Sequence, residues 1–496
     1  MKNIALINAL NLSDYAFKKV LEGESALERV YRYAKSLPDV EEIRIIMAEG
    51  RDQRNELRSF EGDVIEKSTV DKLFEYFRER ARGFDNIFYF YGDTPFLDRR
   101  VTEKMYGDHR KYFAQYTFAD GYPYGIAPEI LDYEIVGILA DMASSEGGKI
   151  ERTSIFDVIK KDINAFDIET LLSPVDLRLL RVSLAADEKR NFQLIKRIFD
   201  LNGRDAESIT SILQSKREIL RTLPSFVSIQ IVRDCPYSCS YCPYPNYLKK
   251  DIDARREMSM ADFKRIIDMV ESFSEDAYIN LSLWGEPSFH PRIGEIMNYV
   301  LSKEKLKLVV ETTGIGWQKS ILETFQDREP IWIVSIDALN SDTYRHLKGE
   351  GFEESVETAE FLLERYPENT YIQAVRMKEN EKELEAFYRH WKKKTNNVII
   401  QKYDHFCQKL PDKRVTDLSP LKRFPCWHLQ RDLYVLSDGT VPICREDLKR
   451  EFLLGNILKE GIEKVWERGQ EYYRDHVEGR YPEICKSCDE YYTYNF

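Results

Sequence analysis

Three cysteines lie close together in the sequence, at Cys235, Cys239 and Cys242, with the spacing C-x3-C-x2-C. A structural zinc site closes its coordination shell with four ligands, and no nearby fourth Cys or His completes such a set. Three thiolates on one short loop can hold a [4Fe–4S] cluster and leave one iron open to an outside ligand. The spacing therefore favours an open-iron cluster, with zinc or a chance grouping as the alternative.

Four further cysteines lie in the C-terminal part of the sequence, at Cys426, Cys444, Cys485 and Cys488. Asp438-Gly439 is a turn signal that predicts a hairpin over 433–443, which would bring the first two of them together. The last two form a C-x2-C pair that completes four thiolates. Four cysteines suit a structural zinc or a fully ligated [4Fe–4S] cluster, and spacing alone does not decide between them.

The elements that must position the first three cysteines form a repeating pattern of strands and helices. The predicted strands are 225–232, 277–284, 305–312, 331–336, 370–375 and 398–402. Six such β/α units predict a partial (β/α)6 barrel, and Ser259 is the predicted N-cap of one of its helices. Chemistry in these barrels lies on loops at the C-terminal ends of the strands, and Cys235 follows the first strand as that rule expects.

With these features the chain resembles the radical S-adenosylmethionine (SAM) family, in which the open iron chelates SAM. The resemblance implies reductive cleavage of SAM to a 5′-deoxyadenosyl radical that abstracts hydrogen from the substrate. It also implies that Tyr241 packs on the adenine and that Glu286 accepts hydrogen bonds from the SAM ammonium. Ser335 would reach the ribose, and Arg376 would pair with the SAM carboxylate. Asp337 is expected to point towards the same mouth.

Each of these roles has a plainer alternative. Glu286 could be a helix-start acid, Ser335 an ordinary strand residue and Arg376 one half of a surface ion pair. Cys407, after the sixth strand, faces the barrel mouth by position, as either a substrate-site thiol or a buried free thiol. The same alternatives apply to His405.

The C-terminal cysteines, with Gly439 between the first two and Trp466 before the last two, resemble the SPASM/twitch extension of radical SAM enzymes. The resemblance is to the shorter arrangement with one cluster. It implies an auxiliary [4Fe–4S] cluster that relays or accepts electrons, and structural zinc is the alternative. An electron donor such as flavodoxin or ferredoxin is implied as well.

The N-terminal third predicts an α/β layer with a parallel sheet, from strands at 4–10, 42–47 and 87–91 alternating with helices. Its segments 19–30, 92–95, 123–129, 184–187 and 194–198 resemble sugar-nucleotide transferases of the cytidylyltransferase type. That resemblance implies that Asp93 and Asp187 hold Mg²⁺, and a turn-capping role is the alternative for Asp93.

The loop that would cradle the nucleotide triphosphate in such a transferase departs from the family pattern. Residues 8–17 contain neither Gly nor Arg, and bulky side chains would obstruct close approach of the backbone to phosphates. The sequence therefore predicts a degenerate, nucleotidyltransferase-like binding or docking domain, with an active transferase or a different fold as the alternatives.

The sequence predicts four regions along the chain. They are a nucleotidyltransferase-like α/β domain (1–204), a helical linker (205–224), the partial barrel (225–404) and the SPASM/twitch-like domain (405–496). This order resembles the spirochaete spiroSPASM family.

A formal net charge of −12 disfavours a nucleic-acid or anionic-membrane surface. No apolar run reaches the length of a membrane span, and cysteines in metal-ligand spacing indicate a reducing, cytoplasmic setting. Three functions stay open. The first is a radical SAM oxidoreductase acting on a peptide or protein, the second an enzyme acting on a sugar or nucleotide-linked substrate, and the third an iron–sulfur scaffold without turnover.

Overall fold

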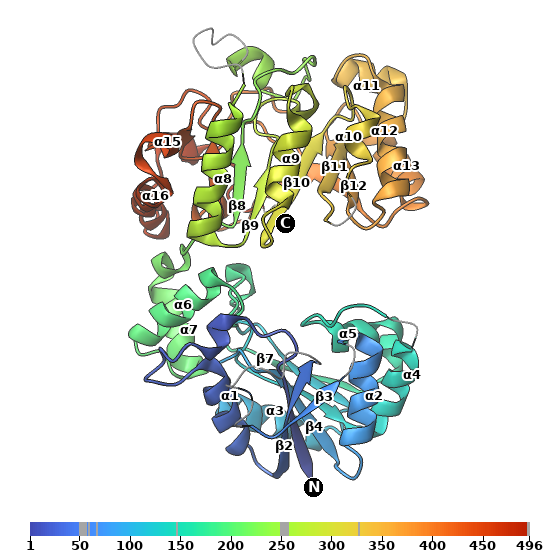
Figure 1. The fold of residues 1–496 in the computed structure, drawn as a ribbon, viewed down its shortest axis with the longest axis vertical. Helices are drawn as coiled ribbons and strands as arrows, with labels where there is room; N and C mark the ends of the chain where they lie inside the picture. Colours follow the sequence, from blue (N-terminus) through green and yellow to red (C-terminus); the bar gives the residue numbers. More distant parts are fainter. Residues whose placement is uncertain are drawn as a thin grey trace. The chain divides into compact units, whose positions relative to one another are not determined.

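A computed structural model describes residues 1–48, 57, 60–65, 68–144, 147–248, 257–325 and 328–493. The chain forms two compact units, Met1–Leu220 and Arg221–Phe496, coloured blue to green and green to red in Figure 1. We call them the N-terminal unit and the C-terminal unit.

The N-terminal unit is built on a seven-stranded sheet of order β3-β2-β1-β4-β6-β5-β7. Its strands are β1 (Asn3–Asn8), β2 (Val40–Ala48), β3 (Gly62–Ile65), β4 (Asn86–Tyr91), β5 (Tyr116–Asp120), β6 (Glu129–Asp132) and β7 (Ile168–Leu172). The predicted α/β layer is present. The expectation of a parallel sheet is wrong for one strand, because β6 runs antiparallel to both β4 and β5.

Helices cover both faces of this sheet, as Figure 1 shows. They include α1 (Ala26–Lys35), α2 (Val70–Arg80), α3 (Arg99–Lys111), α4 (Val136–Ala143), α5 (Ser154–Ile159) and α6 (Lys189–Asp200). Side chains alternate across a strand, so β1 sends Ala5 and Ile7 into one core and Ile4 and Leu6 into the other. Both faces are therefore dry, which explains the continuous apolar run of β1.

The helix expected to act as a linker is α7 (Ala206–Ser215). Ile209 and Leu213 on this helix are fully buried in the core of the N-terminal unit. The helix thus packs as part of that unit, and the chain passes from one unit to the other at Leu220 and Arg221.

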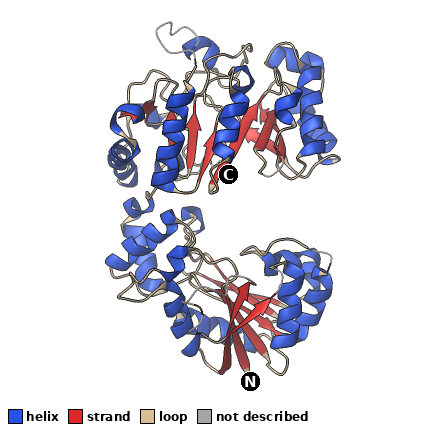
Figure 2. Cartoon of the chain, in the orientation of Figure 1, coloured by secondary structure: helices blue, strands red, loops and turns tan. Residues whose placement is uncertain are grey.

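The C-terminal unit contains a parallel sheet of order β13-β12-β11-β10-β9-β8-β14, drawn in red and flanked by blue helices in Figure 2. Its strands are β8 (Phe226–Ile229), β9 (Ala277–Asn280), β10 (Leu306–Thr312), β11 (Ile331–Ser335), β12 (Thr370–Arg376), β13 (Val398–Lys402) and β14 (Asp432–Val435). All six predicted barrel strands are present, and the first two are shorter than predicted.

Helices follow the barrel strands in the expected alternation. They are α8 (Met260–Ser274), α9 (Ile293–Leu301), α10 (Lys319–Leu322), α11 (Ser341–Leu347), α12 (Phe352–Arg365) and α13 (Glu381–Lys392). The predicted cap at Ser259 is confirmed, because its hydroxyl accepts from the backbone N–H of Asp262 at 3.1 Å.

The predicted C-terminal hairpin is only partly correct. Strand β14 pairs in parallel with β8 and extends the barrel sheet, whereas β15 (Thr440–Pro442) pairs with β16 (Leu453–Asn456). The tight turn at Asp438-Gly439 is present, with Gly439 N–H donating to the Leu436 carbonyl at 2.8 Å. The remaining elements are α14 (Trp427–Arg431), α15 (Ile457–Glu460), α16 (Ile462–Val477) and α17 (Glu483–Lys486).

Within the described ranges, every helix is too short or too polar to cross a bilayer.

Candidate functional site

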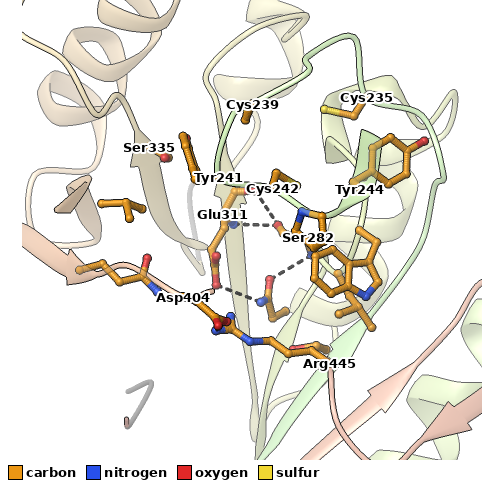
Figure 3. A pocket seen from close by; sticks show the side chains of 18 of the residues that line it. Cys235, Cys239, Tyr241, Cys242, Tyr244, Ser282, Glu311, Ser335, Asp404 and Arg445 are labelled. Carbon is orange, nitrogen blue, oxygen red and sulfur yellow. Dashed lines mark hydrogen bonds and ion pairs between the residues drawn. The ribbon is translucent and has the colours of Figure 1, made fainter. Parts of the chain in front are cut away.

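A cavity of about 250 Å³ lies where the barrel strands end, and Cys235, Cys239 and Cys242 line it. We call it the three-cysteine cavity. Thr312 and Ser335, the last residues of β10 and β11, line it too. Figure 3 shows the cysteines along one side of the cavity in that view, with Asp404 and Arg445 along the other. The structure therefore brings the expected cysteines and strand ends together.

The cysteine loop is anchored by the turn after β9. A Cβ on Gly285 would lie 2.0 Å from the Val232 carbonyl oxygen, so only glycine allows this approach. The next residue, Glu286, donates its backbone N–H to the Asp234 carbonyl at 2.9 Å. Burial raises the pKa of the Cys242 thiol to about 12, so that sulfur stays protonated until a metal displaces the proton.

Glu286 lies in the cavity wall with 2% of its surface exposed. Its carboxylate accepts from the Thr312 hydroxyl at 2.5 Å and from the backbone N–H and hydroxyl of Thr313 at 2.9 and 2.8 Å. A fourth contact, from the Ser288 hydroxyl, is longer at 3.4 Å. Burial raises the pKa of Glu286, and the threonine hydrogen bonds oppose that shift.

Asp337 points towards the cavity as expected, but it is 1% exposed and is not among the described residues that line it. Its Oδ2 accepts from the Tyr241 hydroxyl at 2.7 Å and the Ser335 hydroxyl at 2.8 Å. The same oxygen pairs with Lys348 Nζ at 2.7 Å, and both charged side chains are almost fully buried. Asp337 thus fixes two side chains, Tyr241 and Ser335, that do line the cavity.

Arg376 is not among the described residues that line the three-cysteine cavity, which corrects the expectation that it meets a SAM carboxylate there. Its Nε and Nη2 donate to the two oxygens of Glu381 at 2.8 and 2.6 Å. The preceding residue, Val375, lines the cavity. Successive side chains of a strand point to opposite faces, so Arg376 points away and forms the surface ion pair.

The opposite wall carries polar side chains that sequence reasoning missed, among them Glu311, Asp404 and Arg445. Arg445 Nη2 donates to Asp404 Oδ2 at 2.9 Å, and Asn280 Nδ2 donates to Glu311 Oε1 at 3.1 Å. Burial raises the pKa of Glu311, and the charge of Arg445 opposes the shift. Only Arg445 had a signal in the sequence, since it directly follows Cys444.

A second cavity brings the four C-terminal cysteines together and adds a fifth. Its lining includes Cys407, Cys426, Cys444, Cys485 and Cys488, and we call it the five-cysteine cavity. Cys426 and Cys485 are buried, and the other three are half-buried. The expectation that Cys407 faces the barrel mouth is therefore wrong, although its neighbour Phe406 does line the three-cysteine cavity. His405 pairs with Asp489, with Nε2 3.3 Å from Oδ1.

Two basic side chains, Arg423 and His476, line the five-cysteine cavity. Arg423 Nε and Nη2, and both ring nitrogens of His476, are buried and lack a hydrogen-bond partner within the described part of the chain. Buried polar atoms of this kind normally have partners. Hydrogen-bond donors around several thiols suit an anionic iron–sulfur cluster, whose sulfur atoms accept such bonds. The residues present therefore fit a cluster.

The two cavities share part of their walls. Tyr434 and Arg445 line both of them. The Tyr434 hydroxyl donates to Asp432 Oδ2 at 3.1 Å, and His428 Nδ1 lies 2.6 Å from the same oxygen. Tyr434 is thereby held in one orientation between the two groups of cysteines.

In the N-terminal unit, the structure brings Asp93 and Asp187 together but places Arg152 between them. Arg152 Nη2 donates to Asp93 Oδ2 at 2.6 Å and to Asp187 Oδ2 at 3.0 Å. Burial alone would lower the pKa of Arg152, and the two carboxylates raise it above its ordinary value. The expected Mg²⁺ site is thus corrected, because a guanidinium already neutralises the pair.

A cavity of about 330 Å³ opens beside Arg152, and we call it the aromatic cavity because Tyr91, Tyr124 and Phe156 are among its walls. Glu129 also lines it and accepts a hydrogen bond from the Tyr116 hydroxyl. Burial raises the pKa of Glu129 to about 7, despite that hydrogen bond.

Comparison with known families assigns each group of cysteines to a known domain. The profile of the radical SAM superfamily matches residues 229–390, and that of SPASM, an iron–sulfur cluster-binding domain, matches 426–489. A protein of Treponema pallidum (strain Nichols), described as uncharacterized, is 38% identical over 360 residues, which span 69% of this chain and 98% of that protein.

Solved structures to which the chain shows similarity include SuiB of Streptococcus suis bound to precursor peptide SuiA (14% identity, TM-score 0.45, 73% of this chain and 84% of that one). Another is BtrN in complex with AdoMet and 2-DOIA (16% identity, TM-score 0.37, 52% and 89%). A third is anSMEcpe with bound AdoMet (15% identity, TM-score 0.41, 54% and 84%). From the profile matches and the relative, the chain belongs to the radical SAM superfamily, carries a SPASM domain, and uses SAM, a [4Fe–4S] cluster and an auxiliary iron–sulfur cluster.

Proposed function

We propose that the protein is a radical SAM oxidoreductase that abstracts hydrogen from a peptide or protein side chain, with the auxiliary cluster as electron relay. The observation that carries this proposal is the shared wall of the two cavities. Because Tyr434 and Arg445 line both, the two cavities meet at these side chains. An electron left on the substrate has a short route to the auxiliary cluster.

Cys235, Cys239 and Cys242 would hold the SAM-binding cluster, and Cys426, Cys444, Cys485 and Cys488 would supply the four thiolates of the auxiliary cluster. When bound, the first cluster and SAM supply a carbon-centred radical by reductive cleavage. The work of the chain is to bind and orient these groups and to exclude water.

Three side chains of the three-cysteine cavity are the proposed contacts for SAM. Tyr241 would pack on the adenine and Ser335 would bind the ribose, both held in place by Asp337. Glu286 would accept from the SAM ammonium, a charge-assisted hydrogen bond. The 3.4 Å contact from Ser288 is the weakest of its four, and it is the one that an ammonium group can replace.

The wall of the three-cysteine cavity opposite the cysteines supports a peptide substrate. Arg445 and Asp404 offer both charges to a polar backbone or side chain. Strand β13 lies at the edge of the barrel sheet, and its last residues, Gln401 and Lys402, line the cavity. An exposed edge strand can pair with an extended peptide, which would then reach across the mouth of the cavity.

The cysteines also support a cytoplasmic location, and an electron donor such as flavodoxin or ferredoxin is part of the proposal. All eight are free thiols in the structure, and thiols persist in a reducing compartment.

A sugar or nucleotide-linked substrate is the second candidate, and the aromatic cavity favours it. Aromatic walls with one carboxyl group, Glu129, suit the apolar face and the hydroxyl groups of a sugar ring. With Arg152 between Asp93 and Asp187, this unit would bind or dock a substrate and would not turn over nucleotides.

Deuterium transfer separates the two candidates. Extracts of cells grown on deuterated amino acids, or on deuterated sugars, are divided into peptide and sugar-nucleotide fractions and added to the reconstituted, reduced protein with SAM. We expect deuterium in 5′-deoxyadenosine only with the labelled peptide fraction, and none with the Cys239→Ala variant. Transfer only from the labelled sugar-nucleotide fraction would contradict the peptide proposal and support the second candidate.

A further inference from the structure

The five-cysteine cavity holds one more thiol than a four-iron cluster needs. A fully ligated cluster takes four thiolates, and Cys426, Cys444, Cys485 and Cys488 already make that number. The fifth, Cys407, lies 19 positions before the first of them in the sequence and comes from the loop after β13. It lines the same cavity as Cys488, and its carbonyl accepts from the hydroxyl of Ser487, the residue before Cys488, at 3.4 Å, so the two cysteines lie on neighbouring segments.

The backbone around Cys407 is held in an unusual conformation. Phe406, Cys407 and Gln408 have φ angles of 47°, 53° and 65°, three consecutive left-handed residues without a glycine. Side-chain-bearing residues adopt this conformation rarely, and it persists only where the surroundings impose it. The strain therefore indicates that the position of the Cys407 thiol is fixed by its context.

Two side chains impose this turn. Asp404 Oδ1 accepts from the Phe406 N–H at 2.7 Å, and His405 Nδ1 accepts from the Gln408 N–H at 3.1 Å. The other ring nitrogen of His405 lies 3.3 Å from an oxygen of Asp489, the residue after Cys488. The turn is thus attached to the same segment that carries the thiol beside Cys407.

We propose that Cys407 is a reserve ligand of the auxiliary cluster, able to take the place of Cys488 beside Cys426, Cys444 and Cys485. Cys407 would then hold the iron in place of Cys488, and the proton of the Cys407 thiol would pass to the released Cys488 sulfur. The number of thiolates and the oxidation state do not change.

The turn also connects the exchange to the three-cysteine cavity. The Phe406 side chain lines that cavity and packs against Trp284, with ring centroids 5.4 Å apart. Cys407, the next residue, lines the five-cysteine cavity. A ligand that contacts Phe406 in one cavity therefore acts on the residue directly before Cys407.

Iron counting on the full-length protein tests the proposal. After anaerobic reconstitution, the wild type should contain about eight iron atoms, as two four-iron clusters. Cys488→Ala and Cys407→Ala should each retain about eight, because either thiol completes the set. The double variant should fall to about four, as should the matched control Cys426→Ala, whose position has no reserve, because the three thiolates left come from separate segments and not from one short loop, and one iron loses its ligand.

Electron paramagnetic resonance (EPR) of the reduced samples shows which cluster is lost. The signal of the SAM-binding cluster, which shifts on addition of SAM, should be present in every variant and confirms that the C-terminal unit is folded. Loss of the auxiliary signal in Cys488→Ala alone, or in Cys407→Ala alone, would overturn the proposal. Retention of that signal in the double variant would overturn it as well.

Discussion

Arg152 in the N-terminal unit donates to both Asp93 and Asp187, whereas Arg423 and His476 in the C-terminal unit face the five-cysteine cavity with unpaired nitrogens within the described residues. In the first group, the arginine neutralises the two carboxylates. The second leaves donors and thiols that need a partner. The contrast teaches that residue types alone do not identify a metal site. What identifies it is whether the chain has already filled the position of the ligand.

The largest expected effect is a loss of stability of the N-terminal unit when Arg152 is replaced. Arg152→Ala leaves two carboxylates together, and Asp93 is only 2% exposed. Removing one partner of a buried ion pair costs about 3–5 kcal/mol, and we expect the lower end because the Arg152 side chain is 27% exposed. Mg²⁺ should restore much of the loss, since paired carboxylates suit this ion.

Hydrogen–deuterium exchange across β4 measures this effect. All six tryptophans lie in the C-terminal unit, so their fluorescence does not report on the N-terminal one. Arg152→Lys, which keeps one positive charge, is the matched control and should lose less protection. Equal protection in Arg152→Ala and the wild type, with or without Mg²⁺, would show that the arginine does not stand in for a cation.

Glu129 differs from Asp93 and Asp187, because its hydrogen-bond partner is a neutral group, the hydroxyl of Tyr116. Its pKa is raised to about 7, so the folded state holds the proton more tightly than the unfolded state. Its contribution to stability is therefore fully present below about pH 4.5 and is lost as pH rises to about 7, by about 2–3 kcal/mol. Glu129→Gln removes this loss and keeps an oxygen for Tyr116.

Exchange measured at pH 5 and pH 8, after correction for intrinsic rates, checks this prediction. The gain in protection of Glu129→Gln over the wild type should be larger at pH 8. The same gain at both values would mean that the carboxyl group titrates normally in the folded protein.

The smallest expected effect is a change in the midpoint potential of the auxiliary cluster when His476 is replaced. Burial lowers the pKa of His476 to about 4, so the ring is neutral and offers one N–H to the cavity. Without that donor, His476→Leu should lower the midpoint potential of the auxiliary cluster by on the order of tens of millivolts. An EPR redox titration measures it, with His476→Gln as a control that keeps an N–H. An unchanged midpoint in His476→Leu would show that the ring does not contact the cluster.

Local patterns in the sequence predicted much of this architecture. The barrel strands, the cap at Ser259 and the family of the chain all follow from residues close together in sequence. The three-cysteine loop is of the same kind, because eight consecutive residues carry all its thiols.

Partners that are distant in sequence were not predictable. Arg152 lies 59 residues from Asp93, and nothing in either segment indicates that they meet. Cys407 looked like a mouth residue because its strand ends there, and only the left-handed turn directs its thiol to the other cavity. Arg376 failed for a local reason, since an offset of one residue in a strand reverses the direction of the side chain.

Formation of 5′-deoxyadenosine tests the central claim most directly. The protein is reconstituted anaerobically, its two clusters are verified by iron and sulfide analysis, and it is reduced and mixed with SAM. We predict 5′-deoxyadenosine from the wild type, and from Cys239→Ala no more than in a protein-free reaction. Absence of the product from wild-type protein with both clusters intact would contradict the enzymatic account and leave an iron–sulfur scaffold.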